Sequence, residues 1–96
     1  MKLLRVTQTP SNTKQFMAVF ELDNGKQKIV RFGTKSNYVL NRNKSAQDRA
    51  NYIKRHAVRE NWRNPLSPGA LSRFLLWGNS RSLKANIADF KKRFKL

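Results

Sequence analysis

Two segments of alternating residues flank an Asn-Gly pair, and this arrangement constrains the fold more than any other feature of the chain. Over residues 15–22 the even-numbered positions carry Phe, Ala, Phe and Leu, which a strand places on one face. The pair Asn24-Gly25 favours a type I′ turn, because both central residues of that turn need a positive φ. Residues 27–32 supply the returning strand, so the pattern predicts an antiparallel hairpin.

A further strand is expected over residues 2–8, which alternate in part. The turn-rich residues 9–13 would connect this strand to the hairpin. We therefore expect a small antiparallel β-meander over about residues 2–32. A sheet of this size is marginal by itself, so the rest of the chain must cover its apolar face.

Residues 45–48 read Ser-Ala-Gln-Asp, which has the form of a capping box with Asp in place of the commoner Glu. They predict a helix over about residues 46–60. Its apolar stripe is mostly alanine, and we expect that face to lie close to a neighbouring element. The stripe consists of Ala46, Ala50, Ile53 and Ala57. The preceding residues 33–44 show no period and are expected to form an ordered loop, pinned by Tyr38, Val39 and Leu40.

Two more helices are indicated by capping residues and periodicity. Ser67 followed by Pro68 provides an N-cap and a proline at the first helical position. We expect this helix to cover about residues 68–77 and to end at Gly78. An apolar residue at every third or fourth position predicts the last helix over about residues 83–94. The repeating residues are Leu83, Ile87, Phe90 and Phe94.

The order of these elements, strands first and helices afterwards, predicts an α+β fold with the helices on one face of the sheet. The chain has 96 residues, which fits a single small basic domain over residues 1–96. It contains no cysteine and therefore no disulfide framework. No apolar run approaches the length of a membrane span, and the first residues lack the apolar core of a signal peptide. These features fit an intracellular setting.

Charge indicates the class of partner. The chain has 21 Lys and Arg against five Asp and Glu, a formal net charge of +16. Such an excess favours a polyanionic partner, and nucleic acid is the usual one because neutralising its phosphates releases counterions. Acidic protein surfaces, anionic lipid or a merely soluble basic surface are the alternatives. We expect binding to the backbone of double-stranded DNA without sequence specificity, since the first helix has few base-reading side chains. The candidate nucleic-acid-binding residues are Arg49, Lys54, Arg55, Arg59, Arg63, Arg73, Arg81, Lys84, Lys91, Lys92, Arg93 and Lys95. Arg49, Arg55, Arg59 and Arg63 are expected to share the exposed side of the first helix.

His56 and Glu60, four residues apart on the first predicted helix, are the best candidates for a catalytic or metal site. A zinc site would need further His or Cys ligands, and the chain has one His and no Cys. Acid–base catalysis would need a second tuned group nearby, and the isolated glycines form no phosphate-binding loop. We therefore expect a protein that is not an enzyme, with no metal, no cofactor and no small-molecule substrate.

The second predicted helix is apolar around most of its circumference, so it is either central to the core or in contact with a partner. As partner-contacting residues we select Leu71, Leu75, Leu76 and Trp77. Trp62 and Trp77 could stack on a base or fill the joint between two helices, and we favour the joint for both.

Several segments resemble a family of short basic proteins encoded by giant nucleocytoplasmic DNA viruses of the chlorella-virus and mimivirus kind. These are Phe32-Gly33, "YIKRHAVRENW" (52–62), "NPLSPGALSRFLLW" (64–77) and "LKANIADFKKRF" (83–94). The chain departs from the family pattern where it reads Asn-Arg-Asn-Lys at residues 41–44 and Ser-Pro-Gly at residues 67–69.

The resemblance implies a viral, non-enzymatic protein, and it provides no catalytic residues to carry over. It would place the protein in the virion, and in the interior of the host cell during assembly. Two functions then compete: a protein that binds and condenses packaged DNA, and a minor capsid protein that joins acidic surfaces of the shell. A regulator of host machinery is a third possibility.

Overall fold

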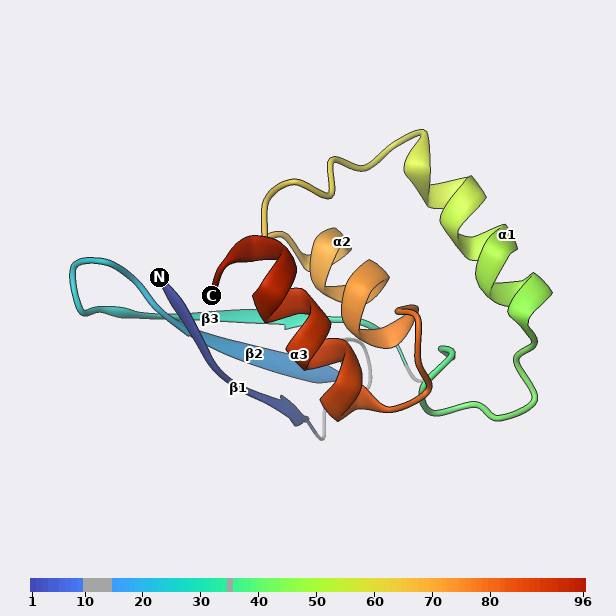
Figure 1. Cartoon of the computed structure of the whole chain (residues 1–96), viewed down its shortest axis with the longest axis horizontal. Helices are drawn as coiled ribbons and strands as arrows, with labels where there is room; N and C mark the ends of the chain where they lie inside the picture. Colours follow the sequence, from blue (N-terminus) through green and yellow to red (C-terminus); the bar gives the residue numbers. More distant parts are fainter. Residues whose placement is uncertain (10–14, 35) are drawn as a thin grey trace.

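The computed structural model describes residues 1–9, 15–34 and 36–96, so most of the predicted turn at residues 9–13 lies outside the described residues. The predicted α+β fold is confirmed, with a three-stranded sheet followed by helices. The elements are β1 (Lys2–Gln8), β2 (Phe16–Glu21), β3 (Gln27–Phe32), α1 (Ala46–Ala57), α2 (Pro68–Leu71), the π-helix η1 (Ser72–Leu76) and α3 (Leu83–Phe94). Figure 1 shows α2, η1 and α3 over the sheet, whereas α1 lies to one side of it. Within the described ranges, no helix has the length and apolar character needed to cross a bilayer.

The sheet is an antiparallel meander in the order β1-β2-β3. Its hairpin is correctly located by the sequence, but the predicted type I′ turn is wrong. The amide of Gly25 donates to the carbonyl of Leu22 over 2.9 Å, and that of Leu22 donates to Lys26 over 2.8 Å. Only Gly25 has a positive φ, of 82°, among the turn residues. The loop is therefore a three-residue turn with glycine in the left-handed position, the next commonest hairpin connection.

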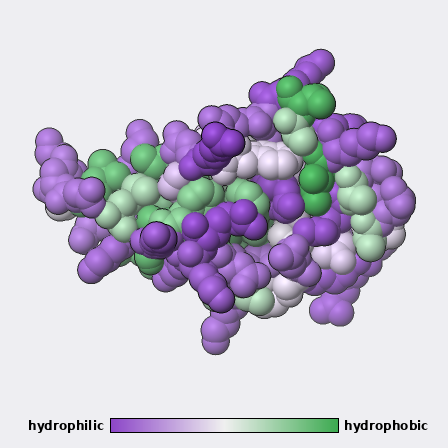
Figure 2. Space-filling model, turned by 45° about the horizontal axis from the view of Figure 1, so that its top comes forward, coloured by the Kyte–Doolittle hydropathy of each residue, from purple (hydrophilic) through white to green (hydrophobic). Residues whose placement is uncertain are grey.

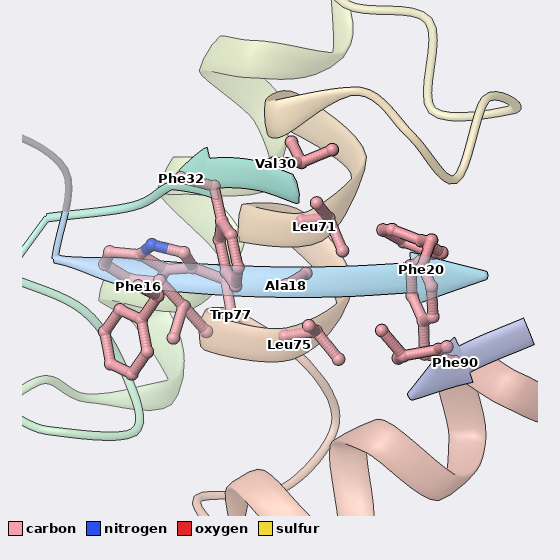
Figure 3. Close-up of a cluster of buried hydrophobic side chains, with 11 residues drawn as sticks. Phe16, Ala18, Phe20, Val30, Phe32, Leu71, Leu75, Trp77 and Phe90 are labelled. Atoms are coloured by element: carbon pink, nitrogen blue, oxygen red, sulfur yellow. The ribbon is translucent and has the colours of Figure 1, made fainter. Parts of the chain in front are cut away.

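The hydrophobic core lies between the sheet and the helices that cover it (Figure 3). As the alternation predicts, the sheet contributes Phe16, Ala18, Phe20, Val30 and Phe32. The helices contribute Leu71, Leu75, Leu76 and Phe90, and Trp77 follows directly after η1. A fully buried side chain of this size contributes about 1.5–3 kcal/mol relative to an exposed one, so this layer provides most of the stability.

The prediction that Leu71, Leu75, Leu76 and Trp77 contact a partner is wrong. Their side chains are 0%, 0%, 1% and 7% exposed, respectively, inside the chain's own core. The reason is the position of α2 and η1, which pack against both β3 and α3. A helix covered on two sides needs apolar residues around most of its circumference. The apolar pattern of this helix therefore reflects a central position in the core, which was the alternative interpretation of the sequence.

The second helix changes from α to π after Leu71, which the sequence does not predict. The amide of Trp77 donates to the carbonyl of Ser72 over 3.0 Å, a bond that spans five residues. The turn after η1 is closed by the buried side chain of Asn86, whose Nδ2 donates to the carbonyls of Leu75 (2.9 Å) and Ser80 (2.8 Å). The first bond satisfies a carbonyl oxygen at the end of the π-helix, and the second satisfies one in the turn that follows.

Gly78 ends the helix for a different reason from the one expected. Its φ is not positive, so it is not a left-handed capping glycine. A Cβ at this position would overlap the carbonyl oxygen of Phe74 and the side chain of Asn86. Close approach of the backbone, rather than its dihedral angles, therefore requires glycine here.

Helix α1 begins with the predicted capping box, in which Ser45 and Asp48 exchange hydrogen bonds. It ends at Ala57, about three residues earlier than expected. The prediction that the alanine face lies close to a neighbouring element is wrong, because Ala46, Ala50 and Ala57 are exposed. The side that meets the rest of the protein carries Arg49 and Tyr52, since long side chains span a distance that alanine cannot.

The loop before α1 is ordered as predicted, but a different residue organises it. Asn37 is fully buried, and its Oδ1 accepts hydrogen bonds from the amides of Val39 (3.0 Å) and Leu40 (2.8 Å). Its Nδ2 donates to the carbonyl of Thr34 over 2.7 Å. Leu40, expected to pin the loop, is 41% exposed. Hydrogen bonds between the buried side-chain amide of Asn37 and the surrounding backbone therefore fix the conformation of this loop.

Candidate nucleic-acid interface

Three of the five acidic residues hold local structure instead of neutralising the basic side chains. Asp23 accepts from the N-terminal amine, which holds the pKa of its carboxyl below the usual range. Asp48 caps α1, and hydrogen bonds from the Ser45 backbone and hydroxyl lower its pKa. Glu60 accepts from the indole Nε1 of Trp62 over 2.8 Å. Within the part of the chain that the structure describes, no Lys or Arg side chain forms an ion pair with a carboxylate.

Arg49 connects α1 to the turn that follows η1. Its Nε lies 3.1 Å from the carbonyl oxygen of Trp77 and 2.7 Å from that of Gly78. One terminal nitrogen donates to Oδ1 of Asn79 over 2.7 Å. The expectation that Arg49 lies on the exposed side of the first helix is therefore wrong. Its guanidinium is used inside the protein, where carbonyl oxygens satisfy it without cancelling its charge.

Arg81 lies in the same turn, shortly before α3, and connects it to the loop before α1. Its guanidinium donates to the carbonyls of Tyr38 (3.1 Å), Asn41 (3.3 Å) and Lys44 in the loop before α1. The same group lies 4.0 Å from the ring centroid of Tyr38, a cation–π contact. Arg49 and Arg81 together attach α1 and its preceding loop to the rest of the protein.

Arg73 is the third predicted binding residue that has partners inside the chain. One terminal nitrogen donates to the carbonyl of Trp77 over 3.0 Å. Its guanidinium lies 5.3 Å from the ring centroid of Trp62 and 5.0 Å from that of Phe74. Burial lowers its pKa, and the nearby charges of Arg49 and Arg93 lower it further. The fold thus holds the guanidinium groups of Arg49, Arg73 and Arg93 near one another despite their mutual repulsion.

The other nine predicted residues lie at the surface, in two groups. The group on α1 and the segment after it consists of Lys54, Arg55, Arg59 and Arg63, and the group on and just after α3 consists of Lys84, Lys91, Lys92, Arg93 and Lys95. All are exposed except Lys91, which is partly buried. The face of the molecule in Figure 2 is mostly hydrophilic, with hydrophobic residues in limited areas. Each group can reach phosphate oxygens, with arginine forming bidentate bonds and lysine acting as a point charge.

A third basic surface was not selected from the sequence, although the strand alternation contains its signal. The face of the sheet away from the helices carries the exposed side chains of Arg5 and Arg31. Beside them is Ile29, which is 56% exposed. The odd-numbered residues of β3 must point away from the core if the even-numbered ones point into it. Applying that rule to charged residues would have placed Arg31 on this surface.

A cleft of about 410 Å³ separates α1 from α2 and η1. Inside it the ring of Tyr52 stacks between His56, at a centroid distance of 4.1 Å, and Trp77, at 4.3 Å. Burial, followed by the charge of Glu60, raises the pKa of Tyr52 to about 12. The sequence places Tyr52 and His56 on one helical sector but does not show that Trp77 completes the stack.

His56 and Glu60 do lie together in this cleft, with Nδ1 of His56 3.5 Å from Oε1 of Glu60. Lys44 and Arg55 also line the cleft. No group of three or more His, Asp or Glu side chains that could hold a metal ion occurs among the described residues. Since Glu60 is already bonded to Trp62, the pair joins the end of α1 to the segment that follows it.

The two tryptophans differ in position. Trp77 fills the joint between α1 and the core, as expected, with its ring nearly parallel to Tyr52 at an interplanar angle of 4°. Trp62 is partly exposed and meets Phe74 edge-on at 6.3 Å. Its indole Nε1 donates to a carboxylate oxygen of Glu60. Both rings are thus used in packing against other parts of the chain.

Comparisons of the chain with protein-family models, with curated proteins and with solved structures return no match. The viral family suggested by the sequence motifs therefore stays a prediction. The function has to be argued from the charge and geometry of the chain itself.

Proposed function

We propose that this protein binds nucleic acid, with double-stranded DNA as the expected form, through backbone phosphates and without sequence specificity. The observation that carries the proposal is the unneutralised charge. The chain has a formal net charge of +16, and its described Lys and Arg side chains form no ion pairs with carboxylates. A surface built only for solubility normally intersperses acids among its bases. Phosphates of a nucleic acid would supply the missing negative charge and release counterions.

The exposed arginines at the end of α1 are the principal contacts in this proposal. Arg55 and Arg59 are exposed on either side of the helix end, and Arg63 follows on the next segment. The lysines and arginine of α3 add a second group of contacts. Few side chains that read base edges accompany them, so contact with the sugar-phosphate backbone accounts for the affinity. The protein acts in this proposal as a non-enzymatic packaging or condensing protein.

The alternative function, a minor capsid protein that joins acidic surfaces, has weaker support. The apolar residues expected to contact the shell are in the core, so such an interaction would depend mainly on the exposed basic side chains. Location in the virion, and in the host cell during assembly, depends on the viral resemblance alone. We keep acidic protein as the competing partner in the test.

The experiment measures binding of the whole protein to several unrelated DNA duplexes by fluorescence anisotropy, over about 50 to about 200 mM salt. We expect similar affinities for all sequences and, if about six phosphates are contacted, a log–log salt slope of about −5. Poly-aspartate is the competitor that represents an acidic protein surface. Stronger binding to poly-aspartate than to duplex at equal charge, or a slope near zero, would contradict the proposal.

A further inference from the structure

A hollow of about 400 Å³ lies between η1, the turn after it and α3. Three of its lining residues are cationic: Arg73 from η1, and Lys92 and Arg93 from α3. The full lining is Arg73, Phe74, Gly78, Asn79, Asp89, Phe90, Lys92 and Arg93. A volume of this order is typical of sites for small ligands.

The guanidinium of Arg73 is incompletely satisfied at this hollow. Its Nε is buried and has no hydrogen-bond partner. One terminal nitrogen donates to the carbonyl of Trp77, but that oxygen also lies 3.1 Å from Nε of Arg49. Two guanidinium groups therefore share one neutral acceptor. Because Arg73 lines the hollow and forms no ion pair with a carboxylate, a negatively charged ligand there would be favoured by charge-assisted hydrogen bonds.

Arg93 is held beside Arg73 by an aromatic ring. The ring centroid of Phe74 lies 4.3 Å from the guanidinium carbon of Arg93 and 5.0 Å from that of Arg73. Contact with the ring positions both guanidinium groups before any ligand arrives. Asp89 also lines the hollow, yet it forms no ion pair with either arginine. The cations outnumber the acid here by three to one.

We propose that this hollow, the Arg73 pocket, is a binding site for a single phosphate group. A phosphate has several oxygens that can accept from two guanidinium forks and from the ammonium of Lys92 at once. Phe74 and Phe90 also line the hollow, and the sugar to which the phosphate is attached would lie on this apolar side of it. Where that phosphate belongs to a nucleic-acid backbone, the inference rests on the proposed function. A free or terminal phosphate would use the same side chains.

The first test titrates inorganic phosphate into the whole protein at constant ionic strength and follows the arginine Nε–H resonances by NMR. We expect the signals of Arg73 and Arg93 to shift and saturate together, whereas that of the exposed Arg42 does not. Absence of a saturable shift at Arg73 and Arg93 would overturn the proposal, with no variant needed.

The second test compares two double variants with the same loss of charge. Lys92→Gln with Arg93→Gln alters the Arg73 pocket, and Lys26→Gln with Lys28→Gln alters the exposed hairpin instead. We expect the pocket variant to bind inorganic phosphate about tenfold more weakly than the hairpin variant, because it lacks charge-assisted donors. Equal weakening in the two variants would show that net charge alone is responsible. Circular dichroism confirms that each variant is folded.

Measurements of DNA binding show whether the phosphate in the pocket belongs to the backbone or to a strand end. They also allow the Arg73 pocket and the proposed DNA-binding function to fail separately. The same variants are measured with a duplex and with single strands that carry or lack a 5′-phosphate. A larger loss of duplex affinity in the pocket variant assigns the site to the backbone. A loss confined to the 5′-phosphorylated strand assigns it to a terminal phosphate. Saturable phosphate binding without any duplex binding would support the pocket and contradict the proposed function, and the reverse result would contradict the pocket alone.

Discussion

The two ends of this molecule are held in place by different interactions. The sheet, α2, η1 and α3 enclose a layer of buried aromatic and aliphatic side chains. Helix α1 buries none of its residues and is held mainly by Arg49, together with the stacking of Tyr52 on Trp77. Arg81 holds the loop before it. One part is stabilised by exclusion of water and the other by hydrogen bonds from guanidinium groups to backbone oxygens.

This difference shows how a chain with a net charge of +16 can fold without many carboxylates. A carbonyl oxygen satisfies the donors of an arginine but leaves its positive charge in place. The arginines that hold α1 therefore still contribute to the field that attracts a polyanion. Because such bonds at a partly exposed site are weaker than a continuous apolar core, α1 should open locally before the rest of the protein unfolds.

The largest effect is expected in the core. Phe90→Ala removes a ring that is 1% exposed, between α3 and the sheet, and should lower the free energy of unfolding by about 3–5 kcal/mol. Urea denaturation followed by tryptophan fluorescence measures the change. Val58→Ala is the control, since Val58 is 82% exposed, and its effect should stay within about 0.5 kcal/mol. Similar effects of the two substitutions would contradict the location of the core.

Replacing Arg49 should affect α1 selectively. Arg49→Ala removes the bonds to two carbonyls and to Asn79, with an expected cost of about 1–3 kcal/mol. Hydrogen exchange should become faster at the amides of α1 and change little in β2. Arg42→Ala, which removes an exposed arginine with the same charge, is the control. Uniform acceleration over the whole chain would show that α1 is not a separate unit of opening.

A smaller effect is expected at the first turn of α1. Ser45→Ala removes the hydroxyl that accepts from the amide of Asp48, and loss of such a cap costs about 1 kcal/mol. The change should appear as faster amide exchange within α1 only. Ser36→Ala, outside the helix, is the comparison. If exchange in the core responds as strongly as exchange in α1, the two regions are more tightly coupled than proposed.

The smallest effect is a pH dependence confined to α1. Hydrogen bonds from Ser45 lower the pKa of Asp48 in the folded protein, so its carboxylate stabilises α1 above the ordinary pKa of Asp. That stabilisation is lost as the pH falls through the lowered value. Asp48→Asn should therefore exchange faster than the wild type at neutral pH, and the difference should disappear in acid. A difference that persists at low pH would exclude the carboxylate as its cause.

The fold was predictable wherever local sequence signals determine it. Alternation identified the core face of β2, and the capping box marked the start of α1, because these patterns involve residues close together in the chain. The turn type depended on Gly25 alone adopting a positive φ, which the Asn-Gly pair did not specify. The π-helix depends on packing against α3 and on Asn86, ten or more residues further along the chain, and no local pattern indicates it.

The candidate site was less predictable. Residue type does not show whether an arginine is exposed at the surface or hydrogen-bonded to the protein's own backbone. The sequence placed Arg49 and Arg55 on one face of a helix, yet only Arg49 bonds to a turn 28 or more residues away. The carbonyls that Arg81 contacts lie up to 43 residues earlier. Such partners are set by the tertiary fold. Arg55 was in contrast predicted correctly as an exposed residue of the helix, whereas Arg59 and Arg63 are exposed but lie beyond the helix end at Ala57.

The most direct test of the account compares the salt dependence of DNA binding in the wild type and in a triple variant, Arg55→Gln, Arg59→Gln and Arg63→Gln. These exposed arginines have no assigned role in holding α1, so the variant should keep the wild-type melting temperature. If each contacts a phosphate, the log–log salt slope should become less steep by about 2.7. An unchanged slope together with a lower melting temperature would show that these side chains serve the fold, and would contradict the account.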